Sequence, residues 1–502
     1  MSLHSIKNKN KIKLSELKDA ELLKLILHFY DNQRYEEVIR LTDKINFKSP
    51  EQYWVHYLKG LSYSKLNNYD KAIKNLNLSL LIKPKSPVCY LELGLAFHGK
   101  KDFSNAELNY KLAASNKENY LQAFTNLGKL YTDIGDFNKA DECFKRALKI
   151  NPNYPVIYNF LGALAEAKNN FFDAKTFYNK SISLDNSYYE PVYNLSFIQL
   201  YENHFIEGWK NFESRWKNNY YKQRKLQTNK PFWTPSIESK GQITIWPEQG
   251  MGDFILFSRF LSDLLIYSKK ITVLVYDKLK PIYERTFPHI EFVTELNTDL
   301  VDYHAPIGDL AKFYISSFKD VKQRSNAYLN VDKLKSEKIK QSFSKDRMIC
   351  GISWISKNDN IGKNKSMTLE DMKDLLLLPD ITFVDLQYTD TSEERAHFKQ
   401  KYGVEIIKLE EIDNFNDIDG LASLINACDK VVSVSNTTVH IAGSIGKETY
   451  LMLPKGRGRL WYWSKENQQS IWYKSIQIIE QTNIGCWSNV VKKIKDELKG
   501  VI

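Results

Sequence analysis

The sequence predicts an α-helical repeat array followed by an α/β region of two parallel-sheet lobes. Small residues recur every 34 residues in the first half. After about residue 241, short apolar strands alternate with helical segments, and the first of these strands runs into a Gly-x-Gly turn. With 502 residues, 43% of them hydrophobic and 26% charged, the chain can form several domains with their own cores.

The repeat is visible in three columns of residues that keep the same 34-residue spacing. The columns are Gly60, Gly94, Gly128 and Gly162; Ala72, Ala106, Ala140 and Ala174; and Leu76, Tyr110, Phe144 and Tyr178. Glycine and alanine mark close crossings of two helices, and the larger residue fills the groove against the next helix. The columns resemble the tetratricopeptide (TPR) pattern. They predict stacked helix pairs with a concave surface that could bind a peptide. Inter-repeat packing is the favoured explanation for the abundant tyrosines, and lining of a peptide-binding groove is the alternative.

The same pattern divides the chain into segments. We expect an N-terminal tail over 1–18, helical repeats over 19–222 with irregular first and last units, and a basic linker over 223–240. Pro231, Trp233 and Pro235 suggest that this linker is pinned to a domain. A first lobe over 241–325 and a second lobe over 326–502, ending in a helix, complete the chain.

Strands and helices alternate in both predicted lobes, as in Rossmann-like parallel sheets, which bind ligands at the carboxyl edge of the strands. For the first lobe we predict strands at 243–246, 271–276, 290–293 and 301–305, with helices at 254–267 and 278–287. For the second lobe we predict strands at 348–353, 381–386, 404–407, 430–434 and 449–453, with helices at 369–377, 418–427 and 438–444.

Composition excludes some classes of function. The formal net charge of +11 suits anionic partners but selects none, and no nucleic-acid motif accompanies it. The five cysteines lack CxxC pairing, which argues against a disulfide framework or a zinc site and favours a reducing cytoplasm. We find no signal peptide, no apolar run of membrane-spanning length and no cluster typical of a divalent metal.

The Gly-x-Gly turn comprises Gly250 and Gly252, and Asp253 follows it at the start of a helix. The glycines let backbone approach a ligand closely. Asp253 is either a general base or a helix N-cap, and spacing alone favours the cap. The nearby helix N-terminus should keep its carboxylate ionised at neutral pH.

W-P-E-Q-G-M-G-D (Trp246 to Asp253) resembles the signature of bacterial proteins that join TPR repeats to a heptosyltransferase-like glycosyltransferase domain of the two-lobed GT-B type. Later landmarks are similar too: G-I-S-W at 351–354, D-L-Q at 385–387 and V-V-S-V-S-N-T-T-V-H-I-A-G-S-I-G-K at 431–447. E-G-W-K-N-F-E-S-R-W at 207–216 is similar to the segment that enters the linker in that group.

This resemblance implies a metal-independent and inverting transfer of a sugar from a nucleotide-sugar donor, with no other cofactor. It also implies a protein acceptor recruited by the TPR groove, since some members are believed to glycosylate flagellin. By position, Asp253 takes the role of catalytic base, and Thr437, Thr438 and His440 meet the donor pyrophosphate. One departure is Ser435, with Asn436 after it, where the family more often has an aspartate. The hydroxyl and the amide can still hydrogen-bond a ribose or phosphate, so both residues are candidate donor ligands.

Other candidate donor-binding residues come from their chemistry. Lys357, like Lys363 and Lys365, lies in a loop after the first strand of the second lobe and could close over a pyrophosphate. Arg457 and Arg459 stand between glycines beside tryptophans, which suits either anion binding or a solvent-facing turn. Glu248 is the second choice as base.

These features predict a cytoplasmic glycosyltransferase that modifies a protein. A non-catalytic scaffold with a degenerate transferase domain is the first alternative. An enzyme of cell-surface polysaccharide assembly is the second, which the peptide-binding repeats disfavour.

Overall fold

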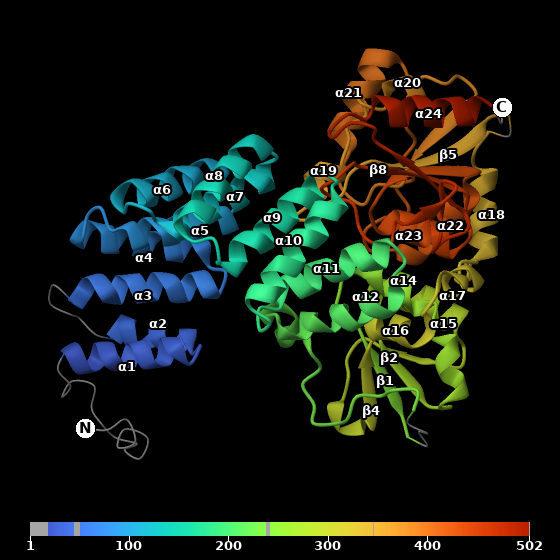
Figure 1. Cartoon of the computed structure of the whole chain (residues 1–502). Coiled ribbons are helices and arrows are strands. Elements are labelled where there is room, and N and C mark those ends of the chain that lie inside the picture. Colours follow the sequence, from blue (N-terminus) through green and yellow to red (C-terminus); the bar gives the residue numbers. More distant parts are fainter. Residues whose placement is uncertain (1–18, 45–50, 237–240, 345, 501–502) are drawn as a thin grey trace. The chain divides into compact units, whose positions relative to one another are not determined.

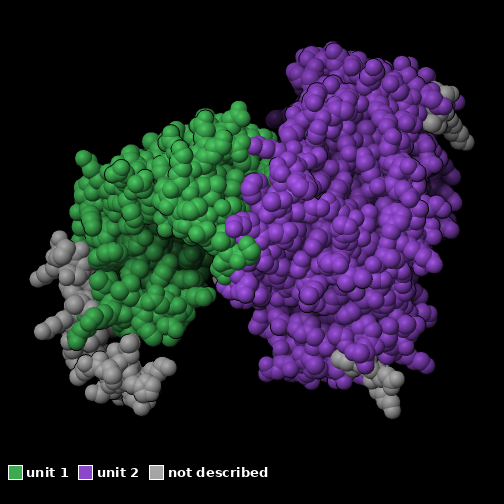
Figure 2. All heavy atoms as spheres, in the orientation of Figure 1, with its two compact units in different colours: residues 1–167, 183–185 green, residues 168–182, 186–502 purple. Residues whose placement is uncertain are grey.

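The computed structural model describes residues 19–44, 51–236, 241–344 and 346–500. The predicted tail 1–18 and the end of the predicted linker lie outside them. The chain divides into two compact units, which Figure 2 shows in different colours. Unit 1 extends to Ala167 and includes Ser183–Asp185, and unit 2 comprises Lys168–Ile182 and Asn186–Ile502.

Unit 1 is a stack of helices, in which each helix packs against the next (Figure 1). They are α1 (Asp19–Asp31), α2 (Tyr35–Lys44), α3 (Glu51–Lys65), α4 (Tyr69–Ile82), α5 (Pro87–Gly99), α6 (Phe103–Asn116), α7 (Leu121–Ile134), α8 (Phe137–Ile150) and α9 (Pro155–Ala167). The N-caps of α4, α6 and α8 are Asn68, Asp102 and Asp136, each accepting a backbone N–H three residues on. These caps form a further 34-residue column, which places the start of every second helix.

The glycine column works as predicted. A Cβ on Gly94 would lie 2.4 Å from Tyr110 Cδ1, and one on Gly128 would lie 2.5 Å from Phe144 Cε1. Glycine is therefore required where the large residue of the second helix lies against the first helix. Tyr110 and Phe144 are fully buried by this contact. The predicted helical array is confirmed.

Unit 2 begins with helices, of which α12 packs against α16 (Leu310–Tyr314) of the first lobe. They are α10 (Phe171–Leu184, whose last two residues count with unit 1), α11 (Glu190–Tyr201), α12 (Phe205–Phe212), the 3₁₀ helix η3 (Glu213–Lys217) and α13 (Asn219–Arg224). Trp209 of α12 is buried and donates its indole N–H to the Ile315 carbonyl at 3.0 Å. The linker residue Trp233 is also buried, with Tyr267 and Phe313 around its ring. The linker is thus pinned to the first lobe, as expected.

Two mostly parallel sheets follow. The first has the order β3-β2-β1-β4, with β1 (Ile243–Trp246), β2 (Ile271–Leu274), β3 (Glu291–Val293) and β4 (Tyr303–Pro306) all parallel. The second has the order β6-β5-β7-β8-β11-β10-β9. Its strands are β5 (Met348–Ser353), β6 (Ile381–Asp385), β7 (Lys430–Val434), β8 (Thr449–Leu453), β9 (Lys465–Glu466), β10 (Gln469–Ser470) and β11 (Ile476–Glu480), of which β9 and β10 are antiparallel.

Helices cover these sheets. They are α14 (Met251–Ser258), α15 (Lys280–Thr286), α16 (Leu310–Tyr314), α17 (Phe318–Gln323), α18 (Lys333–Gln341), α19 (Gly362–Lys365), α20 (Lys373–Leu376), α21 (Ser392–Tyr402), α22 (Ile418–Ala427), α23 (Thr437–Ser444) and α24 (Ser488–Lys499), with short 3₁₀ turns between some of them. In each sheet the strand order reverses beside the first strand, β1 or β5, and parallel sheets bind ligands at such a point.

Three predicted elements are wrong in extent or kind. The helix predicted over 369–377 is helical only over α20, Lys373–Leu376. The helix predicted over 254–267 ends at Ser258, whose hydroxyl donates to the Ile255 carbonyl, and a 3₁₀ turn over Ser262–Ile266 follows. The strand predicted over 404–407 is absent among the described residues, because Ile407 meets β6 only through an isolated bridge to Val384. Apolar runs of a few residues cannot distinguish a strand from a single contact.

Candidate functional site

The Gly-x-Gly turn connects β1 to α14 and sets the position of Asp253. Gly250 is the N-cap of α14, so the N-cap interpretation of Asp253 is wrong, and Asp253 lies in the first helical turn. A Cβ on Gly250 would lie 3.4 Å from Asp253 Oδ2, so the carboxylate turns back toward the N-cap. In this position it accepts the Gly250 backbone N–H.

The Asp253 carboxyl has the electrostatics of a general base. Burial raises its pKa to about 6, against the lowering effects of the Gly250 N–H and of Lys365. The loss of hydration on burial raises this pKa by more than the helix N-terminus lowers it. At neutral pH the group remains mostly ionised, yet it is basic enough to accept a proton near the working pH.

Lys365 faces Asp253 from the second lobe. It ends α19, is 3% exposed, and has a pKa lowered to about 8 by burial, although Asp253 acts to raise it. Among the described residues, no carboxylate lies within ion-pair distance of its ammonium group. A buried ammonium without a close counter-ion is costly, and a bound anion would relieve that cost.

The sequence singled out Lys357 in the same loop, but Lys357 and Lys363 are exposed. Lys365 is the lysine of this loop that the fold buries beside Asp253. The residue pattern G-K-N-K contains no periodicity that could distinguish these lysines, so the distinction rests on the tertiary structure.

His440 completes the contact between the two lobes, where α14 packs against α23. A Cβ on Gly252 would lie 2.9 Å from His440 Cδ2 and 3.2 Å from Nε2, so glycine is needed for this approach. Burial, Lys365 and Arg259 lower the pKa of the imidazole to about 3. The imidazole is therefore neutral, and its Nδ1 lies 3.0 Å from the Tyr473 hydroxyl.

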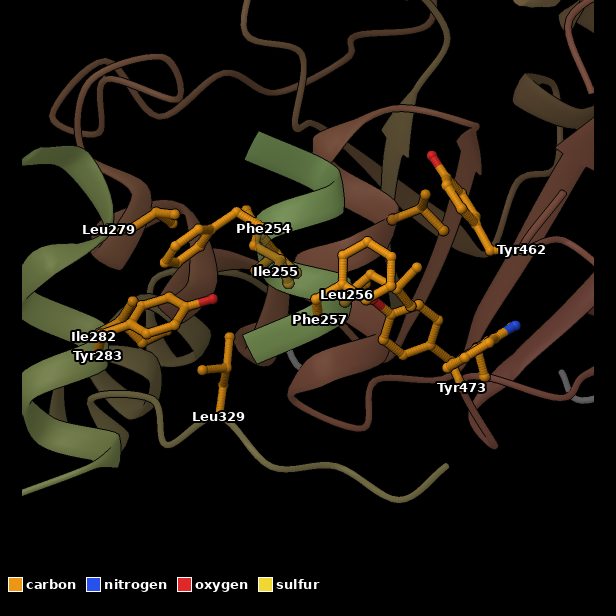
Figure 3. Close-up of a cluster of buried hydrophobic side chains, with 14 of the residues drawn as sticks. Phe254, Ile255, Leu256, Phe257, Leu279, Ile282, Tyr283, Leu329, Tyr462 and Tyr473 are labelled. Atoms are coloured by element: carbon orange, nitrogen blue, oxygen red, sulfur yellow. The ribbon is translucent and has the colours of Figure 1, made fainter. Parts of the chain in front are cut away.

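Figure 3 shows how α14 is held between the lobes. Its buried residues Phe254 and Ile255 lie among Leu279, Ile282 and Tyr283 of the first lobe, and Leu256 and Phe257 lie toward Tyr462 and Tyr473 of the second. Packing on both sides fixes the helix whose first turn carries Asp253.

The segment after β7 contains the predicted pyrophosphate-binding residues. Asn436 caps α23, accepts the Thr438 N–H at 3.1 Å and donates to Ser353 Oγ at 2.7 Å. Ser435 accepts the Trp463 indole N–H at 2.8 Å. Asn436 therefore links the segment after β7 to the end of β5, and Ser435 links it to the segment before β9.

Thr437 and Thr438 follow Asn436 at the start of α23, and they differ from each other in burial. Thr437 is half-buried at the N-terminus of α23. Thr438 is fully buried, and its hydroxyl has no hydrogen-bond partner among the residues described. An unsatisfied buried hydroxyl is unusual and marks a position where a ligand oxygen could complete the bonding.

The two predicted arginines have partners within the protein. Arg459 pairs with Glu480, stacks on the Tyr201 ring at 4.6 Å and donates to Asn169 at 3.3 Å. Arg457 donates to the Asn360 carbonyl at 3.5 Å, which ties its loop to the loop that leads to Lys365.

Glu248 lies just before the Gly-x-Gly turn and connects it to neighbouring segments through polar contacts. Its carboxylate is 1% exposed, lies 3.4 Å from Arg215 and accepts the Gly308 N–H at 3.4 Å. Burial raises its pKa to about 7 despite the charge of Arg215. Arg215 is fully buried and also pairs with Asp309, so the segment before the linker is tied to the Gly-x-Gly turn.

A recess of about 670 Å³ lies elsewhere on the second lobe. It is lined by residues at the amino ends of strands, including Lys430, Thr449 and Ile476. Asp253, Lys365 and Ser435 do not line it, so the predicted site residues and this recess are separate features.

Comparisons with known proteins agree with the helical repeats. Residues 55–86 and 121–154 match the tetratricopeptide repeat. The chain is 27% identical over 319 residues to Protein FlbA of Caulobacter vibrioides, covering 58% of this chain and 52% of FlbA. The match thus spans about half the length of that relative.

Solved structures also resemble part of the chain. A thermophilic TPR protein of Thermus thermophilus is 21% identical, with a TM-score of 0.32, over 36% of this chain and 97% of that one. MamA is 21% identical, with a TM-score of 0.28, over 32% of this chain and 94% of that one. In the part of the chain that the structure describes, no helix is long and apolar enough to cross a membrane.

Proposed function

We propose that unit 2 contains a GT-B-type glycosyltransferase domain, and that the helical array recruits the protein that it modifies. The observation that carries this proposal is the meeting of Asp253 and Lys365, from different lobes, at the start of α14. One group is a carboxylate with a pKa of about 6, and the other is a buried ammonium with no close counter-ion among the described residues. Sugar transfer from a nucleotide donor needs a base and a cation of this kind.

In the proposed reaction, the Asp253 carboxylate takes the proton of the acceptor hydroxyl while that oxygen attacks the anomeric carbon. The bond from this carbon to the phosphate oxygen breaks, and the nucleoside diphosphate leaves with the electron pair. The Lys365 ammonium stabilises the charge that develops on the leaving group, and the Thr438 hydroxyl donates a hydrogen bond to it. Attack opposite the leaving group inverts the anomeric configuration. These steps need no metal ion.

The experiment is a panel of nucleotides and nucleotide sugars, read first by thermal shift and then by sugar transfer. A ligand that binds the folded state raises the melting temperature by an amount that grows with the logarithm of its concentration relative to its dissociation constant. Stabilisation by one nucleotide class, lost in Lys365→Met and kept in Lys363→Met, would support a donor site at Lys365. Stabilisation that is equal in both variants would contradict it.

The scaffold alternative rests on a specific observation. Ser435, Asn436 and Arg459 all have internal partners, so several predicted donor ligands serve the fold. If no nucleotide sugar stabilises the protein or supports transfer, a non-catalytic role follows. An enzyme of cell-surface polysaccharide assembly would instead transfer sugar to a glycan acceptor without a protein.

A further inference from the structure

The first helices of the pairs in unit 1 present a row of residues at matching positions. Two residues before each glycine of the repeat stand Leu58, Glu92, Asn126 and Phe160, on α3, α5, α7 and α9. Helices α3, α5, α7 and α9 contact one another in sequence. The 34-residue register therefore places one acid and one amide in a row with two apolar residues.

Glu92 is the unusual member of this row. It is half-buried, and in the described part of the chain its carboxylate has neither a hydrogen-bond partner nor an ion pair. Lys65 is the charged group that acts on it, but the two do not form an ion pair. A half-buried carboxylate without a protein partner is left to water, so it is available to a cation from outside the chain.

Tyrosines on several elements lie within electrostatic range of Glu92. Tyr30 of α1, Tyr57 of α3, Tyr110 of α6 and Tyr120 before α7 all have pKa values raised first by burial and then by the charge of Glu92. Tyr57 is half-buried and meets the exposed Trp54 edge-on at 5.8 Å. Tyr110 and Tyr120 are buried, whereas Tyr30 and Tyr57 are half-buried. An accessible aromatic face near a carboxylate attracts a cation through both charge and the ring quadrupole.

Asn126, on the next helix, is half-buried and makes no hydrogen bond among the described side chains. A side-chain amide carries both donors and an acceptor, which matches the backbone of an extended peptide.

We propose that this face of unit 1 binds an extended segment of a partner protein, whose lysine or arginine side chain pairs with Glu92 among the tyrosines. The inference deepens the proposed function, because it specifies the chemistry of the protein that the array recruits. It rests on the proposed function only in saying why the partner is recruited, because binding of the partner does not require sugar transfer.

The test uses the full chain and a random 12-residue peptide library displayed on phage. Selected peptides should share a lysine or arginine at one fixed position. As a synthetic peptide, the best binder should lose at least about tenfold in affinity to Glu92→Gln, since a charge-assisted bond contributes roughly 1.5–3 kcal/mol. The control Glu118→Gln removes an exposed acid of the same unit and should leave affinity unchanged.

A double-mutant cycle identifies the contact. Replacing the basic residue of the peptide with norleucine should weaken binding to the native chain, but not weaken binding to Glu92→Gln any further. The proposal is overturned if the selection yields no binder, if the binders lack a shared basic residue, or if Glu92→Gln binds like the native chain. None of these outcomes touches the transferase proposal, which the nucleotide panel tests separately.

Discussion

Units 1 and 2 each hold a carboxylate whose pKa is raised by burial, but the two groups have different neighbours. Asp253 reaches a pKa of about 6 and receives an N–H from Gly250 and the field of Lys365. Glu92 reaches a pKa of about 7, and only Lys65 acts to lower it. The internal partners of Asp253 are consistent with a group that exchanges protons. Glu92 has no such partner among the described residues, which is consistent with a group that binds a cation from outside the chain.

The largest expected effect is the loss of sugar transfer, without loss of donor binding, in Asp253→Asn. Asp253→Asn keeps the size of the side chain and removes its basicity, so transfer should fall by about 10²–10⁴-fold while donor binding stays unchanged. Transfer is measured with saturating donor, and Asp299→Asn, at an exposed position of the first lobe, is the control. Native-like transfer by Asp253→Asn would move the base elsewhere, with Glu248 the next candidate.

Lys365 should connect the two lobes electrostatically. Lys365→Met keeps the buried volume but removes the charge, so donor affinity should fall by about 10–100-fold, the range for a charge-assisted hydrogen bond. The pKa of Asp253 should also rise above about 6, because Lys365 now lowers it. The acidic limb of the pH–rate profile reports this second effect, which a purely structural role would not produce.

The pH profile itself sharpens the role of Asp253. Since the ionised form is the base, kcat/KM should be constant above the folded pKa of about 6 and fall about tenfold per unit below it. In Asp253→Asn the residual rate should lack this limb. A native profile that is flat from pH 7 to pH 5 would exclude Asp253 as the base.

The smallest effect concerns the stability of unit 1. Because the folded pKa of Glu92 lies above its ordinary 4.5, this group stabilises the fold below pH 4.5, and that contribution is lost as the pH rises through about 7. Glu92→Gln should therefore raise the melting temperature by a few degrees at pH 8 and not at pH 4.5. The facing groups are Lys65 and the four tyrosines, and the raised pKa values of the tyrosines keep them neutral between these two pH values.

An equal melting temperature at pH 8 would mean that Glu92 is hydrated or paired in solution. In that case the contrast between the two carboxylates disappears, and with it the argument for an external cation. Calorimetry of the native chain and of Glu118→Gln under the same conditions provides the reference.

Local pattern determined the order of the elements. The 34-residue columns fixed the helix pairs because each glycine must accommodate the large residue of its partner helix, as Gly94 does for Tyr110. Alternation and the Gly-x-Gly turn likewise predicted both parallel sheets and the place of Asp253 at the start of the helix after β1. These signals are short in range, and a single sequence contains them.

Only the tertiary structure decided which charged groups matter and what state they are in. Lys357, Lys363 and Lys365 look alike in the sequence, yet the fold buries Lys365 alone of the three, beside a carboxylate of the other lobe. The pKa of Asp253 rises although a helix N-terminus favours its charge, because burial by distant segments outweighs a local dipole. Glu92 gains its tyrosine surroundings in the same way, from helices that are far apart in the chain. Hydration depends on the sum of long-range contacts, and no local pattern of residues encodes that sum.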